Sequence, residues 1–115
     1  MGTLTNAYDG LRISELMTSN QGSVPDDKGE YPDWVEVWNS SDRDISLAGV
    51  GLSDRGDSIR FLFPDVTLKA GERTVVYCDD TNQAEAGKAF HAKFKLSSVG
   101  ETVYLFDPSA YTIDQ

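Results

Sequence analysis

The clearest alternation of hydrophobic and polar positions in this chain is a run of seven residues in the order Asp-Trp-Val-Glu-Val-Trp-Asn. Successive side chains of a β-strand point to opposite faces of its sheet. Val35 and Val37 are therefore expected to enter a core. Trp34, Glu36 and Trp38 are expected to point to the opposite face. The run predicts a strand of a sheet that buries one of its faces.

Short blocks of the same kind recur along the chain and are separated by segments rich in Gly, Asp, Asn and Ser, which favour turns. The blocks are residues 11–17, 34–38, 50–52, 59–63, 73–78, 102–106 and 111–113. About seven short strands with this spacing are typical of a sandwich of two sheets. The pattern thus predicts an all-β fold, an immunoglobulin-like antiparallel β-sandwich. Residues 82–88 are the one segment with the composition of a helical turn, which Gly87 would end.

The alternation within these blocks also predicts which side chains form the core. The expected core residues are Val35, Val37, Val76, Val103 and Leu105. Cys78 follows the same face as Val76, so it is expected to fill a small core position rather than to act as a nucleophile.

The length of 115 residues fits one domain, and no linker or internal repeat divides it. We expect residues 1–115 to be a single domain excised from a longer protein, with residues 1–10 as an N-terminal flank.

The balance of charge excludes several classes of partner. Ten Lys and Arg residues stand against 19 Asp and Glu residues, which gives a formal net charge of −9. A surface of this sign repels the phosphates of nucleic acids and anionic lipids, so we expect no nucleic-acid binding. The chain has no continuous apolar run of membrane-spanning length, and we expect no direct insertion into a membrane.

Few side chains in the sequence are suited to catalysis. His91 is the single histidine, and no nucleophile elbow, phosphate-binding loop or zinc-ligand spacing accompanies it. We therefore expect that the chain is not an enzyme, that its active-site and metal-ligand sets are empty, and that His91 is a partly exposed residue of a strand. Asn39 begins an Asn-Ser-Ser glycosylation sequon, although Asn at the end of a strand is more simply a turn former.

The acidic loops make calcium a conceivable cofactor. Calcium binds oxygen ligands from such loops, and no other cofactor is expected. Turns also recruit Asp for its hydrogen bonds to the backbone, and none of the loops follows the order of a twelve-residue calcium loop. The acidic loop residues are Asp26, Asp27, Glu30, Asp33, Asp54, Asp57, Asp79 and Asp80.

Four segments together resemble the lamin tail domain family, an immunoglobulin-like module of nuclear lamins and of many prokaryotic surface proteins. They are residues 11–17 (Leu-Arg-Ile-Ser-Glu-Leu-Met), 33–39, 63–78 with the turn from Pro64 to Gly71, and 95–108. The resemblance covers nearly the whole chain. The acidic surface and the absence of coiled-coil heptads make it similar to the prokaryotic branch rather than to the lamins.

This resemblance implies a non-catalytic recognition or tethering module of a secreted or envelope-associated bacterial protein, with an unidentified protein or cell-surface glycan as partner. The alternative is a structural spacer beside a hydrolase domain, without a ligand of its own. The oligomeric state stays open.

The candidate contact surface is the outward aromatic face, represented by Trp34, Glu36, Trp38 and Tyr104. An exposed pair of tryptophans beside a carboxylate suits stacking on a sugar or anchoring an apolar side chain. The opposing interpretation is that the loop of residues 22–32 covers this face, since Trp seldom stays exposed.

Overall fold

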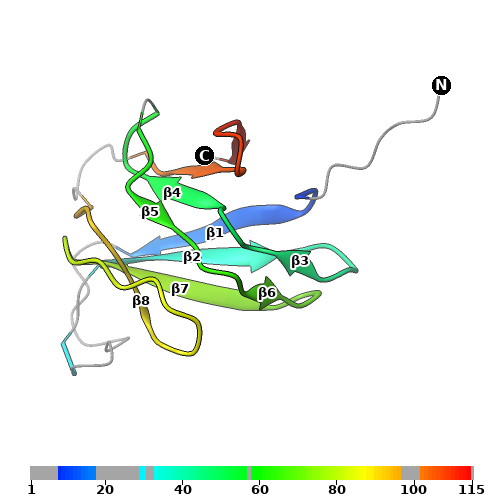
Figure 1. The fold of residues 1–115 in the computed structure, drawn as a ribbon, viewed down its shortest axis with the longest axis horizontal. Coiled ribbons are helices and arrows are strands. Elements are labelled where there is room, and N and C mark those ends of the chain that lie inside the picture. Colours follow the sequence, from blue (N-terminus) through cyan, green and yellow to red (C-terminus); the bar gives the residue numbers. More distant parts are fainter. Residues whose placement is uncertain (1–7, 18–28, 31–32, 57, 97–101, 115) are drawn as a thin grey trace.

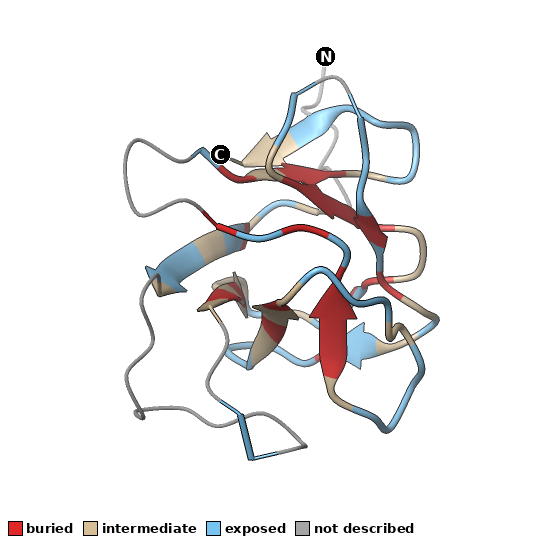
Figure 2. Ribbon diagram, turned by 90° about the vertical axis from the view of Figure 1, so that its left-hand side faces the viewer, coloured by how far each residue is buried: buried red, intermediate tan, exposed pale blue. Residues whose placement is uncertain are grey.

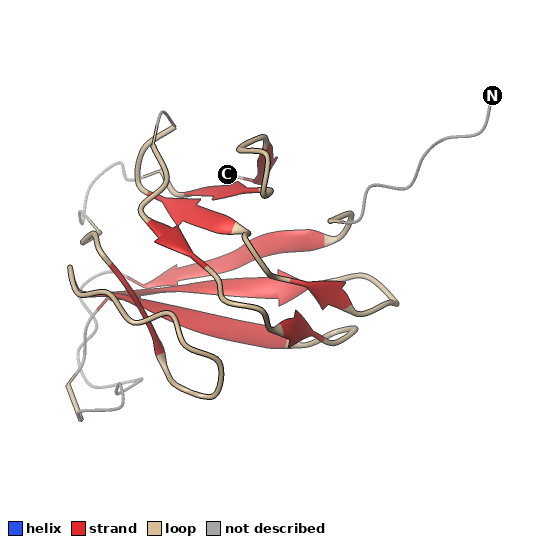
Figure 3. Cartoon of the chain, viewed as in Figure 1, coloured by secondary structure: helices blue, strands red, loops and turns tan. Residues whose placement is uncertain are grey.

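The computed structural model describes residues 8–17, 29–30, 33–56, 58–96 and 102–114. In these residues the regular structure is entirely β, as Figure 3 shows, and no helix is long and apolar enough to cross a membrane. The strands are β1 (Leu11–Met17), β2 (Asp33–Asn39), β3 (Ile45–Ser46), β4 (Gly51–Ser53), β5 (Phe61–Leu62), β6 (Thr67–Leu68), β7 (Arg73–Cys78), β8 (Phe90–Ala92), β9 (Tyr104–Phe106) and β10 (Thr112–Asp114).

Two four-stranded sheets face each other across the core (Figure 1). The first sheet has the order β1-β2-β7-β8 and the second the order β10-β9-β4-β5, while β3 and β6 form a small separate pair. Among the strands in the described ranges, every pairing is antiparallel except that of β7 with β8, which is parallel. The predicted immunoglobulin-like β-sandwich is confirmed, and the parallel pair is its one departure from the antiparallel expectation.

The core lies between the two sheets, where Figure 2 shows the buried segments of both layers. All five predicted core residues are buried, with 0% exposure for Val35, Val37, Val76 and Leu105 and 2% for Val103. Their burial follows from the period-two alternation of β2, β7 and β9. Cys78 is also buried in this cluster, as predicted.

Three phenylalanines fill one end of the core. The ring centroids of Phe61, Phe63 and Phe90 lie 5.0 to 6.0 Å apart, and their planes meet edge to face. This arrangement places the positive edge of one ring against the negative face of the next.

Two expectations about local structure are corrected. Residues 82–88 form no helical turn; a bond from the Lys88 N–H to the Glu85 carbonyl closes a tight turn, and Gly87 adopts a φ of +84°. Strand β8, which the alternation did not indicate, holds His91, and that side chain is 1% exposed rather than partly exposed.

Candidate binding surface

The outward face of β2 is more enclosed than the sequence suggested. Trp34 is 4% exposed and Trp38 is half-buried, and neither indole N–H has a hydrogen-bond partner among the described residues. The burial of Trp34 agrees with the interpretation that this face is covered, and it leaves no pair of exposed indoles. The loop proposed as their cover lies outside the described residues except at 29–30.

Glu36 and Trp38 are engaged by their neighbours within the sheet. The Ser14 hydroxyl donates to Glu36 Oε1 at 2.8 Å, and Arg73 Nε lies 3.4 Å from the same oxygen. The Arg73 guanidinium also lies over the Trp38 ring, with its carbon 4.6 Å from the ring centroid. The indole face that a sugar would use is already covered by a side chain of the same domain.

Tyr104 belongs to a different surface. It lies on β9 in the second sheet, whereas Trp34, Glu36 and Trp38 lie on β2 in the first. Its ring stacks on Phe106, with centroids 6.0 Å apart and planes 17° apart. The interpretation that these four residues share one aromatic face is corrected, because the sandwich separates their strands into two layers.

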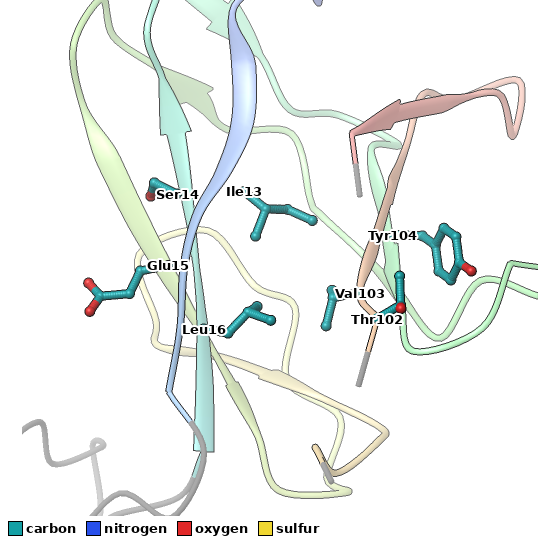
Figure 4. A pocket seen from close by; sticks show the side chains of 7 residues that line it. All are labelled: Ile13, Ser14, Glu15, Leu16, Thr102, Val103 and Tyr104. Carbon is teal, nitrogen blue, oxygen red and sulfur yellow. The ribbon is translucent and has the colours of Figure 1, made fainter. Parts of the chain in front are cut away.

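A groove runs between β1 and β9 along the side of the sandwich where the two sheets stand apart (Figure 4). The groove is open to solvent and has a volume of about 600 Å³. Ile13 and Leu16 point into it from β1 and Val103 from the segment before β9, whereas the Tyr104 ring points away (Figure 4). The lining residues are Ile13, Ser14, Glu15, Leu16, Thr102, Val103 and Tyr104.

A β-bulge explains why Leu16 faces this groove. The pairing of β1 with β2 shifts between Ile13 and Glu15, so Ser14 and Glu15 together oppose Glu36. Strict alternation would place Ile13 and Leu16 on opposite faces, and the extra residue brings them to the same one. Leu16 stays 39% exposed there, so its side chain adds apolar surface to the groove.

A buried histidine, His91, pairs with the partly buried Asp79 at the far side of the first sheet. The Asp79 Oδ2 and His91 Nδ1 atoms are 2.8 Å apart, and the imidazole lies 5.4 Å from the Tyr77 ring. Partial burial raises the pKa of the Asp79 carboxyl, but hydrogen bonds from Thr81 and His91 outweigh burial and hold this pKa below its ordinary value of 3.8. The sequence did not indicate this pair, since its members are twelve residues apart.

The contacts of the Asp79–His91 pair stabilise the loop between β7 and β8. His91 and Gln83 exchange two backbone hydrogen bonds of 3.0 Å, and Gln83 Nε2 donates to the Ala89 carbonyl at 2.7 Å. Asp79 Oδ1 accepts from the Thr81 hydroxyl at 2.6 Å. Both members of the pair thus tie the segment between β7 and β8 to the sheet.

The acidic loops bring together no set of metal ligands in the part of the chain that the structure describes. Three of the acidic residues considered for calcium, Asp26, Asp27 and Asp57, lie outside it. Calcium binding therefore stays a prediction.

Asn39 has a structural role at the end of β2. Its side-chain N–H groups donate to the carbonyls of Arg43 at 2.7 Å and Leu68 at 2.9 Å. Its Oδ1 accepts from both the N–H and the hydroxyl of Ser41. Because the residue is 0% exposed, the turn-forming role fits the folded domain and a glycan on Asn39 does not.

The fold defines the class of this protein: two mainly antiparallel sheets packed face to face form an immunoglobulin-like sandwich. The family model of the lamin tail domain matches residues 5–115, and the chain belongs to that family. The lamin tail domain is a non-catalytic, immunoglobulin-like module. Among curated proteins, none matches this chain.

Proposed function

We propose that this domain is a non-catalytic recognition or tethering module of a secreted or envelope-associated bacterial protein, and that its partner, a protein or a cell-surface glycan, binds the groove between β1 and β9. The observation that carries the proposal is Leu16, which a bulge turns into the groove although 39% of its surface stays exposed. Bulges beside functional sites often re-aim a side chain in this way. The family's non-catalytic nature supports the same class of function.

The groove is a better candidate than the outward face of β2. On that face Arg73 covers Trp38, and Ser14 and Arg73 satisfy Glu36, so a ligand would first have to displace contacts within the domain. In the groove, Ile13 and Leu16 offer apolar surface that a ligand can cover without breaking such contacts.

The second candidate is a structural spacer that holds a neighbouring hydrolase domain and has no ligand of its own. The observation that favours it is the outward face of β2, where Arg73 contacts both Trp38 and Glu36. Side chains that contact one another within the domain are expected on a surface without a partner. The spacer and the recognition module differ in whether the groove binds anything.

Glycan and peptide arrays test this difference. The domain should bind a subset of spots, and Leu16→Asp should abolish that binding by placing a charge in the groove. Leu62→Asp is the matched control, because Leu62 is 53% exposed on β5 and does not line the groove. If the domain binds no spot on either array, the spacer is favoured. If Leu16→Asp and Leu62→Asp lose binding to the same extent, the groove is not the binding surface.

A further inference from the structure

Strand β1 lies at an edge of the first sheet, with β2 on one side and the groove on the other. Edge strands carry backbone N–H and C=O groups that no strand of their own sheet uses. These groups are the usual template on which a further strand is added. The free edge of β1 is therefore a candidate for strand addition.

The hydrogen bonds show which backbone groups face that edge. The Ile13 N–H donates to Asp114 Oδ2 at 2.9 Å, so it points away from β2. Ile13 pairs with Val37, and Leu16 pairs with Val35, two residues along the same strand. Because antiparallel pairs alternate in their hydrogen bonding, Leu16 also directs its N–H and C=O away from β2. No described residue bonds these two groups.

Asp114 protects one part of this edge and leaves the rest open. Its carboxylate takes the position at Ile13 that the carbonyl of an added strand would otherwise occupy. The edge beyond Ile13, at Glu15 and Leu16, has no such protection among the described residues. A strand added there would begin beside Asp114 and run along the apolar groove.

The charge of the edge selects the kind of strand. A second hollow of about 360 Å³ continues the line of β1 past Leu11 and Arg12. The charged residues that line the two hollows are Asp9, Arg12, Glu15, Asp107 and Asp114. Glu15 and Asp114 lie along the path of the added strand, and their carboxylates repel an acidic strand and the same edge of a second copy of this chain. The further carboxylates of the second hollow add to the negative charge at the end where the strand begins.

We propose that an extended, basic segment of a partner protein adds to the free edge of β1 as a further strand of the first sheet. Its backbone pairs with the Leu16 N–H and C=O. Its alternate apolar side chains pack on Ile13, Leu16 and Val103, and its Lys or Arg side chains face Glu15 and Asp114. This inference rests on the proposed function, because it names the partner chemistry of the same groove.

A labelled synthetic peptide of about eight residues, alternating Val and Lys, tests the proposal by fluorescence anisotropy. The domain should bind it and should not bind the counterpart with Glu in place of Lys. N-methylation of alternate amides removes backbone donors without changing side chains, so methylation in the register that faces β1 should weaken binding about tenfold. Equal affinity of the methylated and parent peptides would overturn strand addition.

Variants of the protein locate the binding. Leu16→Lys should abolish binding of the Val–Lys peptide, because it places a like charge at the groove, whereas Leu62→Lys should not. Glu15→Lys provides a second change on β1, at an exposed position, that keeps the apolar residues, and it should also weaken binding. Circular dichroism checks that each variant is folded. Equal effects of Leu16→Lys and Leu62→Lys would overturn the assigned site.

The outcomes separate this inference from the proposed function. Failure of the basic peptide together with Leu16-dependent binding of a glycan would overturn strand addition and keep the recognition groove. Failure of every array and peptide would overturn both. A dimer that Leu16→Lys dissociates would place a second copy on the edge and would also overturn the inference.

Discussion

Asn39 shows how one buried polar side chain holds several segments together. Its amide bonds link the end of β2 to the carbonyls of Arg43 and Leu68, and thereby to the turn that follows and to β6. Buried polar groups of this kind stabilise a fold only when all of their hydrogen bonds are made. At Asn39 both the donor and the acceptor side of the amide are satisfied.

We expect Asn39→Ala to lower the free energy of unfolding by about 2–4 kcal/mol, since it removes the side-chain donor to the Arg43 and Leu68 carbonyls and the acceptor for Ser41 at a buried position. Urea titration measures the change. The matched control is Asn82→Ala, at an exposed loop position, which should cost less than about 0.5 kcal/mol. Similar losses in the two variants would contradict the structural role of Asn39.

Asp79 gives a pH-dependent contribution whose sign follows from its lowered pKa. A carboxyl whose pKa is lower in the folded state stabilises the fold above the unfolded-state value of 3.8, and this contribution is lost as the pH falls through the folded-state pKa. Asp79→Asn should therefore be less stable than the wild type at neutral pH. The difference should shrink as the pH falls below 3.8.

Urea titrations from neutral to acidic pH measure this difference, and Asp80→Asn is the control. Asp80 is exposed and has a φ of +61°, which Asn also tolerates, so the substitution should leave the curve nearly unchanged. A difference between Asp79→Asn and wild type that stays constant with pH would mean that the hydrogen bonds from Thr81 and His91 do not favour the charged carboxylate.

At the scale of elements, each central strand of the first sheet has a buried and an outward face. Val37 on β2 is 0% exposed in the core, whereas Val75 on β7 is half-buried on the outer face. The two residues are of the same type and lie on neighbouring, paired strands. They therefore form a matched pair for measuring what the core contributes.

Val37→Ala should cost roughly 1–3 kcal/mol, because it removes two methyl groups and leaves a cavity. Val75→Ala should cost less, because solvent and flexible side chains can fill the space. Thermal and urea unfolding measure both. Equal losses would mean that the two faces of the sheet contribute alike and would contradict the assigned core.

The strands also show how much of the fold the sequence predicts. The bounds of β1 and β7 agree with the alternating blocks, because a half-buried strand records its two faces in its own residues. The two-residue strands β3 and β6 are too short to show a period. Strand β8 depends on parallel pairing with β7, and distant pairing leaves no local pattern.

The residues of the groove were harder to predict from the sequence than the strands. The bulge at Ser14 exists only in the pairing of β1 with β2, so alternation alone cannot place Leu16 beside Val103. The sequence shows which residues are aromatic, but their division between the two sheets depends on the order of the strands. Tyr104 is the one residue of the predicted surface that also lines the groove.

For the molecule as a whole, the chain belongs to a non-catalytic family, and β1 lies at one edge of the sandwich beside the groove. A screen of the purified domain against esterase, phosphatase, glycosidase and nuclease substrates should give no activity above background. His91→Ala serves as the control for contamination, because a background activity from another protein would persist in it. An activity that His91→Ala abolishes would contradict the non-catalytic account.

The proposed binding surface is the groove between β1 and β9. Its most direct test is NMR mapping of backbone amide shifts while a ligand selected on the arrays, or the Val–Lys peptide, is titrated into the labelled domain. The account predicts that the largest shifts fall on residues 13–16 and 102–104. Shifts centred on Trp38 and Arg73 instead would contradict it, because they would return the binding surface to the outward face of β2.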